Sequence, residues 1–364
     1  MLYIWLGEEN MVLVKVNELK TGMVLAKDIY HLNSSILLAE GTELQNTFIT
    51  KLKDSGISEV YIQDLRINVE VDDLVSEEVK QRTATIMSRA IKSIPEGLKD
   101  DFPEIEKMVS EILDELLLND DIIIQLSNIR AIGDYTLNHS INVCVYSIIT
   151  ALTMNYEKRE LLELGVGALL HDIGKIMIPN SLLNKPDRLN DEEYEIVKDH
   201  TIRGYEILKQ IDGISERARR IALLHHERMD GKGYPTGVFG NDIDEFVKIV
   251  SVVDVFDALT SDRIYREKIE SHLALEYLIS MSKIQFDYET VRHFVQNVAI
   301  YPIGTGVSLS SGEIGIVRRV NKEFPTRPYI RVIKDKHGNS MQTPKDYDLM
   351  KELSIFIMKR IDIV

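Results

Sequence analysis

The sequence predicts a multidomain protein in which an all-α core lies between a β-rich N-terminal module and a small β-rich C-terminal appendix. The chain has 364 residues, and domains usually take about 100–200 residues, so two or three domains are expected. Apolar residues recur at three- and four-residue spacing through the middle of the chain, which is the period of a helix. Both ends carry short alternating apolar runs separated by glycine, as strands do.

The predicted boundaries follow these changes of pattern. Residues 1–70 form the N-terminal module, for which we expect a regulatory role. Residues 71–129 form a connector of amphipathic helices, and such helices often pack against another domain or a second copy, so a homodimer through the connector is one expectation. Residues 130–298 form the helical core. Residues 299–364 form the β-rich extension, with a hairpin turn at 336–339.

The composition excludes several functional classes. Asp and Glu total 58 against 43 Lys and Arg, which gives a net charge of −15, and so acidic a surface repels polymeric nucleic acid. No stretch approaches the ~18 consecutive apolar residues of a membrane span. The single cysteine, Cys144, lies in an apolar segment and is expected to be buried. These features favour a cytoplasmic protein that takes a small molecule at a local cleft.

Histidines are concentrated in one part of the helical core. Five of the nine lie between positions 139 and 226. Neutral imidazole is the commonest protein ligand for transition metals, and carboxylates join it where two divalent ions are held together. The clustering therefore points to a metal site.

Two acidic residues strengthen this interpretation. His171-Asp172 ends the apolar run 161–170, a predicted helix, and Gly174 follows, where glycine can end the helix and let the backbone turn towards a cleft. Asp254 lies in a nearly continuous apolar segment, where an unpaired carboxylate carries a large desolvation cost. A cation is therefore expected beside Asp254, and a metal ion is the natural one.

The other histidines sit near predicted helix ends. Neighbouring helix residues project about 100° apart, so His225 and His226 reach one cleft together only at the end of their helix. His200 falls in a helix predicted to start at Asn190, where Glu193 completes a capping box. Taken alone, His200 fits a surface or core histidine better than a ligand.

Several separated motifs lie in the helical core. They are His139-Ser140, His171-Asp172-Ile173-Gly174-Lys175, His200, His225-His226-Glu227, Gly233-Tyr234-Pro235 and Asp254. In this order and spacing, over residues 130–270, the chain resembles the HD-GYP phosphodiesterases, a branch of the HD-domain metal hydrolases. The resemblance implies that the core is an HD-type helical bundle. The flanking segments resemble the β-rich N-terminal module and the C-terminal extension found on many such proteins.

The resemblance implies a centre with two divalent transition metal ions, bridged by Asp172. Family members use iron or manganese, and five imidazoles with two carboxylates suit either ion better than magnesium, while zinc accepts the same types of ligand. Asp172 and Lys175 would serve catalysis, with Lys175 near the attacked phosphate. The implied metal ligands are His139, His171, Asp172, His200, His225, His226 and Asp254.

The implied substrate is cyclic di-GMP, cleaved to linear pGpG or to GMP. Gly233 and Tyr234 would shape the pocket. Arg263 and Arg266 would contact the second phosphate or the guanine face. Lysine and arginine at such positions are otherwise typical of solvated surface charge.

The sequence differs from some members of the family at one position, and two other functions are alternatives to the predicted one. Members with three metals carry a carboxylate four residues before the first histidine, and here that position is Tyr135, with Asp134 beside it. A third ion is therefore not expected. A protein that binds cyclic di-GMP without turnover would show gaps among the ligands, and none is evident. An HD-type di-iron oxygenase would have no use for Arg263 and Arg266 as phosphate contacts.

Overall fold

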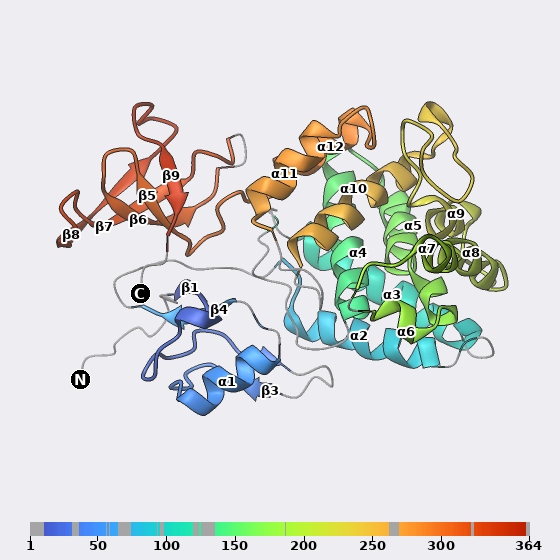
Figure 1. Cartoon of the computed structure of the whole chain (residues 1–364), viewed down its shortest axis with the longest axis horizontal. Helices are drawn as coiled ribbons and strands as arrows, with labels where there is room; N and C mark the ends of the chain where they lie inside the picture. Colours follow the sequence, from blue (N-terminus) through green and yellow to red (C-terminus); the bar gives the residue numbers. More distant parts are fainter. Residues whose placement is uncertain are drawn as a thin grey trace. The chain divides into compact units, whose positions relative to one another are not determined.

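The chain folds into two compact units (Figure 1). One joins residues 1–73, 123–133 and 298–364, and the other joins 74–122 and 134–297. The first contains all the strands among the described residues, and the second is helical. A helical core and a β-rich C-terminal segment are thus present, as predicted. The computed structural model describes residues 11–30, 36–55, 57, 59–64, 74–92, 94, 98–118, 124, 135–185, 187–261, 269–321 and 324–361.

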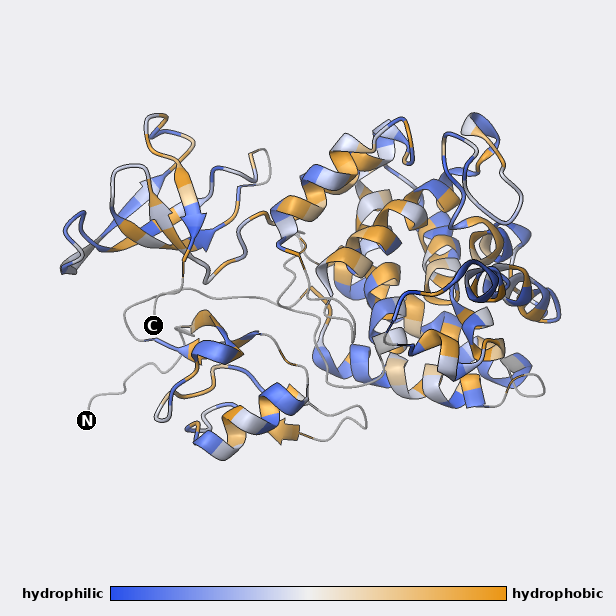
Figure 2. Cartoon of the chain, viewed as in Figure 1, coloured by the Kyte–Doolittle hydropathy of each residue, from blue (hydrophilic) through white to orange (hydrophobic). Residues whose placement is uncertain are grey.

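Three helices form the centre of the helical unit: α4 (Tyr135–Thr153), α5 (Lys158–Leu169) and α10 (Glu245–Thr260). Figure 2 shows hydrophobic residues along most of α4 and α10. A helix that is apolar on nearly every side belongs in the interior. Gly165 in α5 allows close packing there, because a Cβ at this position would lie 2.8 Å from Ile148 of α4. Cys144 of α4 is buried, as predicted.

The other helices surround this centre, and none in the described ranges has the length and hydrophobicity that crossing a bilayer requires. They are α2 (Glu77–Lys92), α3 (Leu98–Leu117), α6 (Asn180–Leu183), α7 (Asp191–Lys198), α8 (His200–Lys209), α9 (Glu216–Leu224), α11 (Ser271–Ser280) and α12 (Tyr288–Gln296), with the 3₁₀ helices η3 (Ile173–Met177) and η4 (Gly240–Asp242).

The amphipathic helices α2 and α3 pack inside their own unit. The apolar residues Val109, Ile112 and Leu116 of α3 are fully buried, and α3 contacts α4 and α5. Ser76, just before α2, is held by Glu115 of α3, whose Oε2 accepts from the Ser76 N–H at 2.6 Å. The apolar face of the connector is therefore covered within one chain, and a homodimer through it stays a prediction.

The strands of the described residues form three antiparallel sheets. β1 (Met11–Lys15) pairs with β4 (Glu59–Gln63), and β2 (Ile29–Tyr30) pairs with β3 (Ile36–Leu38). Near them lie η1 (Val16–Glu18) and α1 (Asn46–Asp54). The third sheet has the order β8-β7-β6-β5-β9, built from β5 (Gly306–Leu309), β6 (Ile314–Arg319), β7 (Tyr329–Lys334), β8 (Ser340–Asp348) and β9 (Ile357–Arg360).

Local chemistry explains the hairpin between β7 and β8. The Asp335 carboxylate accepts from the backbone N–H groups of His337 and Asn339, both at 2.9 Å. Gly338 has a positive φ of 83°, which favours glycine. The turn predicted at 336–339 is confirmed.

The N-terminal and C-terminal strands share one hydrophobic core. Ile316 of β6 and Ile333 of β7 pack in the same buried cluster as the side chains of β1 and β4. Glu59 of β4, almost fully buried, pairs with Arg360 of β9 at 2.6 Å. The two ends of the chain therefore fold as one unit, while the middle of the chain forms the helical unit.

Candidate metal centre

The predicted ligands converge where several helices of the second unit begin or end. His171 and Asp172 follow the end of α5, His225 and His226 follow the end of α9, and His200 is the first residue of α8. His139 and Asp254 come from the interior of α4 and α10. Six of these seven residues are buried, and His226 is partly exposed. A helix end lets consecutive residues reach one point, as predicted for the His225–His226 pair.

Two local predictions need correction. The capping box at Asn190 and Glu193 is present, but that helix ends at Lys198, and His200 begins a new helix after a break at Asp199. Gly174 does not simply end a helix, since it lies within η3. A Cβ on Gly174 would lie 1.9 Å from the His200 carbonyl oxygen. Glycine is required here because η3 and the start of α8 pass this close.

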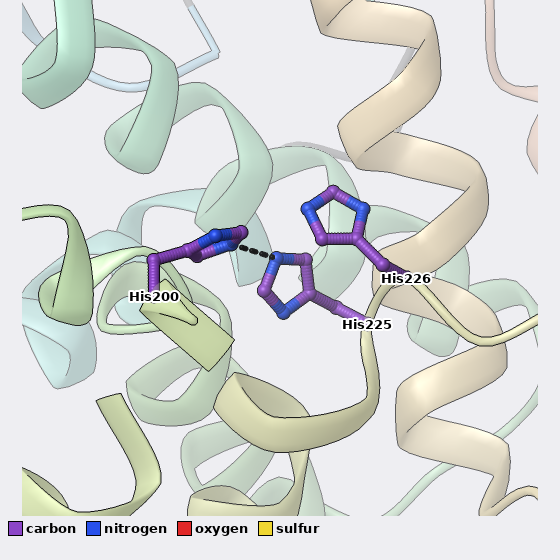
Figure 3. Close-up of side chains that lie close together, drawn as sticks. All are labelled: His200, His225 and His226. Carbon is purple, nitrogen blue, oxygen red and sulfur yellow. Dashed lines mark hydrogen bonds between the residues drawn. The ribbon is translucent and has the colours of Figure 1, made fainter. Parts of the chain in front are cut away.

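The ligand atoms form three overlapping groups, and within each group they lie within 4.8 Å of one another. Figure 3 shows one of them, with the rings of His200, His225 and His226 turned towards one another. The groups are His139, His171 and Asp254; His200, His225 and His226; and His171, Asp172 and His225.

The hydrogen bonds of the rings fix which nitrogen faces the centre. Nδ1 of His171 lies 2.7 Å from the Ala168 carbonyl, and Nδ1 of His200 lies 2.6 Å from the Val197 carbonyl. Nδ1 of His225 faces a carbonyl in the same way, at 3.0 Å. A carbonyl only accepts, so Nδ1 carries the proton in each ring and Nε2 presents a lone pair. Backbone carbonyls orient metal-bound histidines in this way.

These lone pairs face other acceptors. Nε2 of His200 and Nε2 of His225 lie 3.4 Å apart, and they lie 3.5 and 3.7 Å from Oδ1 of Asp172. Among the described residues, Asp172 Oδ1 and His171 Nε2 have no hydrogen-bond partner. Buried acceptors that face one another without a donor are costly unless a cation lies among them. The residues therefore fit divalent metal ions.

The protonation states of the imidazoles suit the same role. Burial lowers the pKa of His226 to about 3 and holds the pKa of His225 well below its usual range. Burial also lowers the pKa of His200. A histidine must be neutral to bind a metal through its ring nitrogen. These three rings are ready to ligate at neutral pH.

The carboxylates are ionised despite their burial. Burial opposes the charge of Asp172, but Lys175 and the nearby histidines hold the pKa of that carboxyl well below its usual range. The Lys175 ammonium forms an ion pair with Oδ2 of Asp172, and its side chain is 29% exposed. Lys175 thus lies at the edge of the cluster, partly open to solvent. Burial also opposes the charge of Asp254, but His139 donates to that carboxylate and the pKa is held well below its usual range.

Asp257 orients His139 and was missed by the sequence analysis. Oδ2 of Asp257 lies 2.7 Å from Nδ1 of His139, and Oδ1 accepts from the Asn142 amide at 2.7 Å. Nε2 of the same ring lies 3.1 Å from Asp254. Burial opposes a charge on His139, but the two carboxylates raise its pKa to about 9. The available signal was position, since Asp257 follows Asp254 by three residues and shares its helix face.

A loop after the histidine pair covers one side of the cluster. The Tyr234 ring lies on the His226 ring, with centroids 4.7 Å apart. A Cβ on Gly233 would lie 2.4 Å from Cα of Glu227, so the loop folds back tightly on the helix end. The buried Glu227 carboxylate accepts from the backbone N–H groups of Thr236 and Gly237, at 2.7 and 3.0 Å. Glu227, whose role the sequence did not reveal, therefore anchors this loop.

Three of the predicted positions lie outside the described residues. These are Arg263, Arg266 and Asp134. Tyr135 begins α4, and its side chain also lies outside the description.

Comparisons with known proteins define the class. Residues 125–290 match the family model of the HD domain, and residues 306–363 match that of a KOW domain associated with the HD domain. These two segments are therefore similar to the HD domain and to the KOW module associated with it. The resemblance predicted from the motifs is confirmed.

Two curated relatives are named for the cyclic dinucleotides on which they act. The cyclic di-GMP phosphodiesterase PA4108 of Pseudomonas aeruginosa is 32% identical over 276 residues, which cover 74% of this chain and 63% of that protein. The 3′3′-cGAMP-specific phosphodiesterase 3 of Vibrio cholerae is 37% identical over 40% of this chain and 32% of its own length. The chain thus spans less than two thirds of either relative.

One solved structure has the same fold over most of the chain. Bd1817, an HD-GYP-type protein of Bdellovibrio bacteriovorus, aligns with a TM-score of 0.50 and 20% sequence identity. The alignment covers 78% of this chain and 98% of that one. At this identity the likeness concerns the fold alone.

Proposed function

We propose that this chain is a metal-dependent phosphodiesterase that hydrolyses cyclic di-GMP to linear pGpG or GMP. One observation carries the proposal. Nε2 of His171, which has no hydrogen-bond partner, and the facing Nε2 atoms of His200 and His225 surround the buried Asp172 carboxylate. The similarity to phosphodiesterases of cyclic dinucleotides supports the choice of substrate.

The residues of the proposed centre would hold two ions, iron or manganese, and Asp172 would be a ligand of both. Two of the three groups of ligand atoms support a division between two ions. The group of His139, His171 and Asp254 belongs to one proposed ion, and the group of His200, His225 and His226 belongs to the other. The first ion would take His139, His171, Asp172 and Asp254, and the second would take Asp172, His200, His225 and His226. Bound together, two such ions supply a hydroxide at neutral pH and neutralise charge on the attacked phosphodiester.

Lys175 provides a proton and a positive charge beside that centre. Its ammonium pairs with Asp172 and remains partly exposed, so it can reach a phosphate that enters from solvent. There it would offset the negative charge that develops on the phosphate, or donate its Nζ proton to the departing ribose oxygen. Asp257 keeps His139 in the orientation that directs Nε2 to the centre.

The substrate class rests on shared chemistry. The Pseudomonas relative is named for cyclic di-GMP and the Vibrio relative for 3′3′-cGAMP, and both molecules contain guanine and a phosphodiester ring. Gly233 and Tyr234 lie in the loop over the cluster, which supports their role at the pocket wall. Arg263 and Arg266 stay proposed contacts to the second phosphate or the guanine face.

The test is hydrolysis by the full chain loaded with Mn²⁺. Incubation with cyclic di-GMP should give linear pGpG or GMP on chromatography, and the Asp172→Ala variant should give neither. Circular dichroism of the variant should match the wild type, since the helices keep their apolar faces. A wild-type chain that loads metal but leaves cyclic di-GMP, 3′3′-cGAMP and cyclic di-AMP intact would contradict the proposal.

A further inference from the structure

Two aromatic residues and a lysine lie beside the proposed metal ligands. They are Tyr194 and Lys198 of α7, and Tyr234 of the loop that follows His226. We call these three residues the α7 rim. The Lys198 ammonium lies 4.7 Å from the centroid of the Tyr194 ring and 5.4 Å from that of Tyr234. The two tyrosine rings lie edge to face, with centroids 6.3 Å apart. A lysine over two aromatic faces is held in place by cation–π attraction.

The α7 rim is joined to the proposed ligands at two points. Tyr234 lies on the ring of His226, with a small interplanar angle of 31°. The last turn of α7 holds a second ligand, because the Val197 carbonyl accepts from Nδ1 of His200. The rim therefore borders the proposed metal ligands.

The rim keeps part of the Tyr194 ring and part of the Lys198 side chain, which is 25% exposed, accessible from solvent. Tyr194 is 45% exposed, so part of its ring surface is open to solvent. Lys198 donates to Glu195 at 2.6 Å, but that partner is 70% exposed. An ion pair with so exposed a partner is weak. The lysine can thus exchange Glu195 for an acceptor on a ligand at little cost.

We propose that Tyr194 and Lys198 bind one guanine base of the cyclic dinucleotide, and so set the preference for guanine over adenine. This inference rests on the proposed function. The Tyr194 ring offers a stacking surface for a base, as aromatic side chains do for single nucleotides. Lys198 donates to O6 and N7 of guanine, which both accept. On the same edge adenine presents an amino group in place of O6, so there it accepts only at N7.

Lys198→Met in the full Mn²⁺-loaded chain separates base recognition from other roles. We expect KM for cyclic di-GMP to rise about tenfold, as for a lost hydrogen bond to a charged group. KM for cyclic di-AMP should change far less, while kcat and bound metal stay constant. Lys209→Met is the matched control, because Lys209 lies 5.9 Å from the Tyr205 ring on the neighbouring helix α8 in the same kind of contact. It should leave every value unchanged.

Other results would overturn the inference. Equal rises in KM for both cyclic dinucleotides would mean that Lys198 binds a phosphate instead of a base. Unchanged KM in Lys198→Met, or a loss of metal from it, would also refute the assignment. Tyr194→Leu gives a second test, since removal of the stacking surface should weaken binding of both dinucleotides without changing kcat.

Equilibrium binding of cyclic di-GMP separates this inference from the proposed function. A wild-type chain that binds cyclic di-GMP without cleaving it, and loses affinity in Lys198→Met, would contradict the phosphodiesterase activity but support the rim. A chain that cleaves cyclic di-GMP equally well with and without Lys198 would support the activity and refute the rim. A chain that neither binds nor cleaves it would refute both.

Discussion

Gly174→Ala tests whether the close contact between η3 and α8 sets the geometry of the metal centre. The added Cβ would lie 1.9 Å from the His200 carbonyl oxygen and 2.5 Å from the Gly204 nitrogen. Both are backbone atoms, which cannot rotate away. Real Cβ atoms essentially never approach closer than 3.0 Å, so one of the two elements has to move by about 1 Å.

This displacement would move proposed metal ligands and the proposed catalytic lysine. Asp172 and Lys175 flank Gly174 on one side of the contact, and His200 lies on the other. Overpacking of this kind costs about 1–3 kcal/mol of stability. A displacement of about 1 Å between reacting groups can lower the rate by ~100-fold. We therefore expect Gly174→Ala to have a lower Tm, weaker Mn²⁺ binding and ~100-fold lower kcat.

Gly204→Ala is the matched control on the facing helix. Its Cβ would find no atom closer than 3.4 Å, which is an ordinary contact. Alanine is preferred to glycine inside a helix by up to about 1 kcal/mol, so this variant should be as stable as the wild type or slightly more so. Thermal unfolding, metal titration and steady-state hydrolysis on both variants provide the data. A Gly174→Ala chain with wild-type Tm and activity would refute the reasoning.

Three further predictions concern single side chains. Asp257→Asn should lower Mn²⁺ affinity by ~10–100-fold, because it weakens the hydrogen bond that orients His139. Titration measures the affinity, and circular dichroism should be unchanged. Wild-type affinity in this variant would argue against that role of Asp257. Mn²⁺ affinity should increase as pH rises from 7 towards 9. The pKa of His139 is about 9 in the metal-free chain, and its proton must leave before Nε2 binds a metal. Constant affinity over this pH range would contradict the prediction. Lys175→Ala should lower kcat strongly with little change in KM for cyclic di-GMP, because its charge is needed most as charge develops on the phosphate; a change confined to KM would show a binding role instead.

The sequence predicted the elements whose signals are local. Spacing and helix-end patterns indicated that His171, Asp172 and the His225–His226 pair lie at helix ends, and the structure has them there. The capping box at Asn190 was predicted because both of its residues lie within one turn. The turn before β8 was predicted because glycine and asparagine favour it.

Features that depend on distant contacts could not be predicted. The role of Asp257 depends on a ring 118 positions earlier in the chain. The requirement for Gly174 arises from the carbonyl of His200, which only the folded chain brings near. The shared core of the two β-rich ends depends on side chains about 300 residues apart, such as Glu59 and Arg360. Periodicity and motif spacing contain no information about such pairs.

The central claim is that the buried acceptors around Asp172 hold two transition metal ions. The direct measurement is elemental analysis of the full chain purified without oxygen, with protein concentration determined on the same sample. The account predicts two ions of iron or manganese per wild-type chain, and one or none in Asp172→Ala, whose bridging carboxylate is gone. A wild-type chain with a reproducible third ion at the site, or an Asp172→Ala chain that keeps both ions, would contradict it.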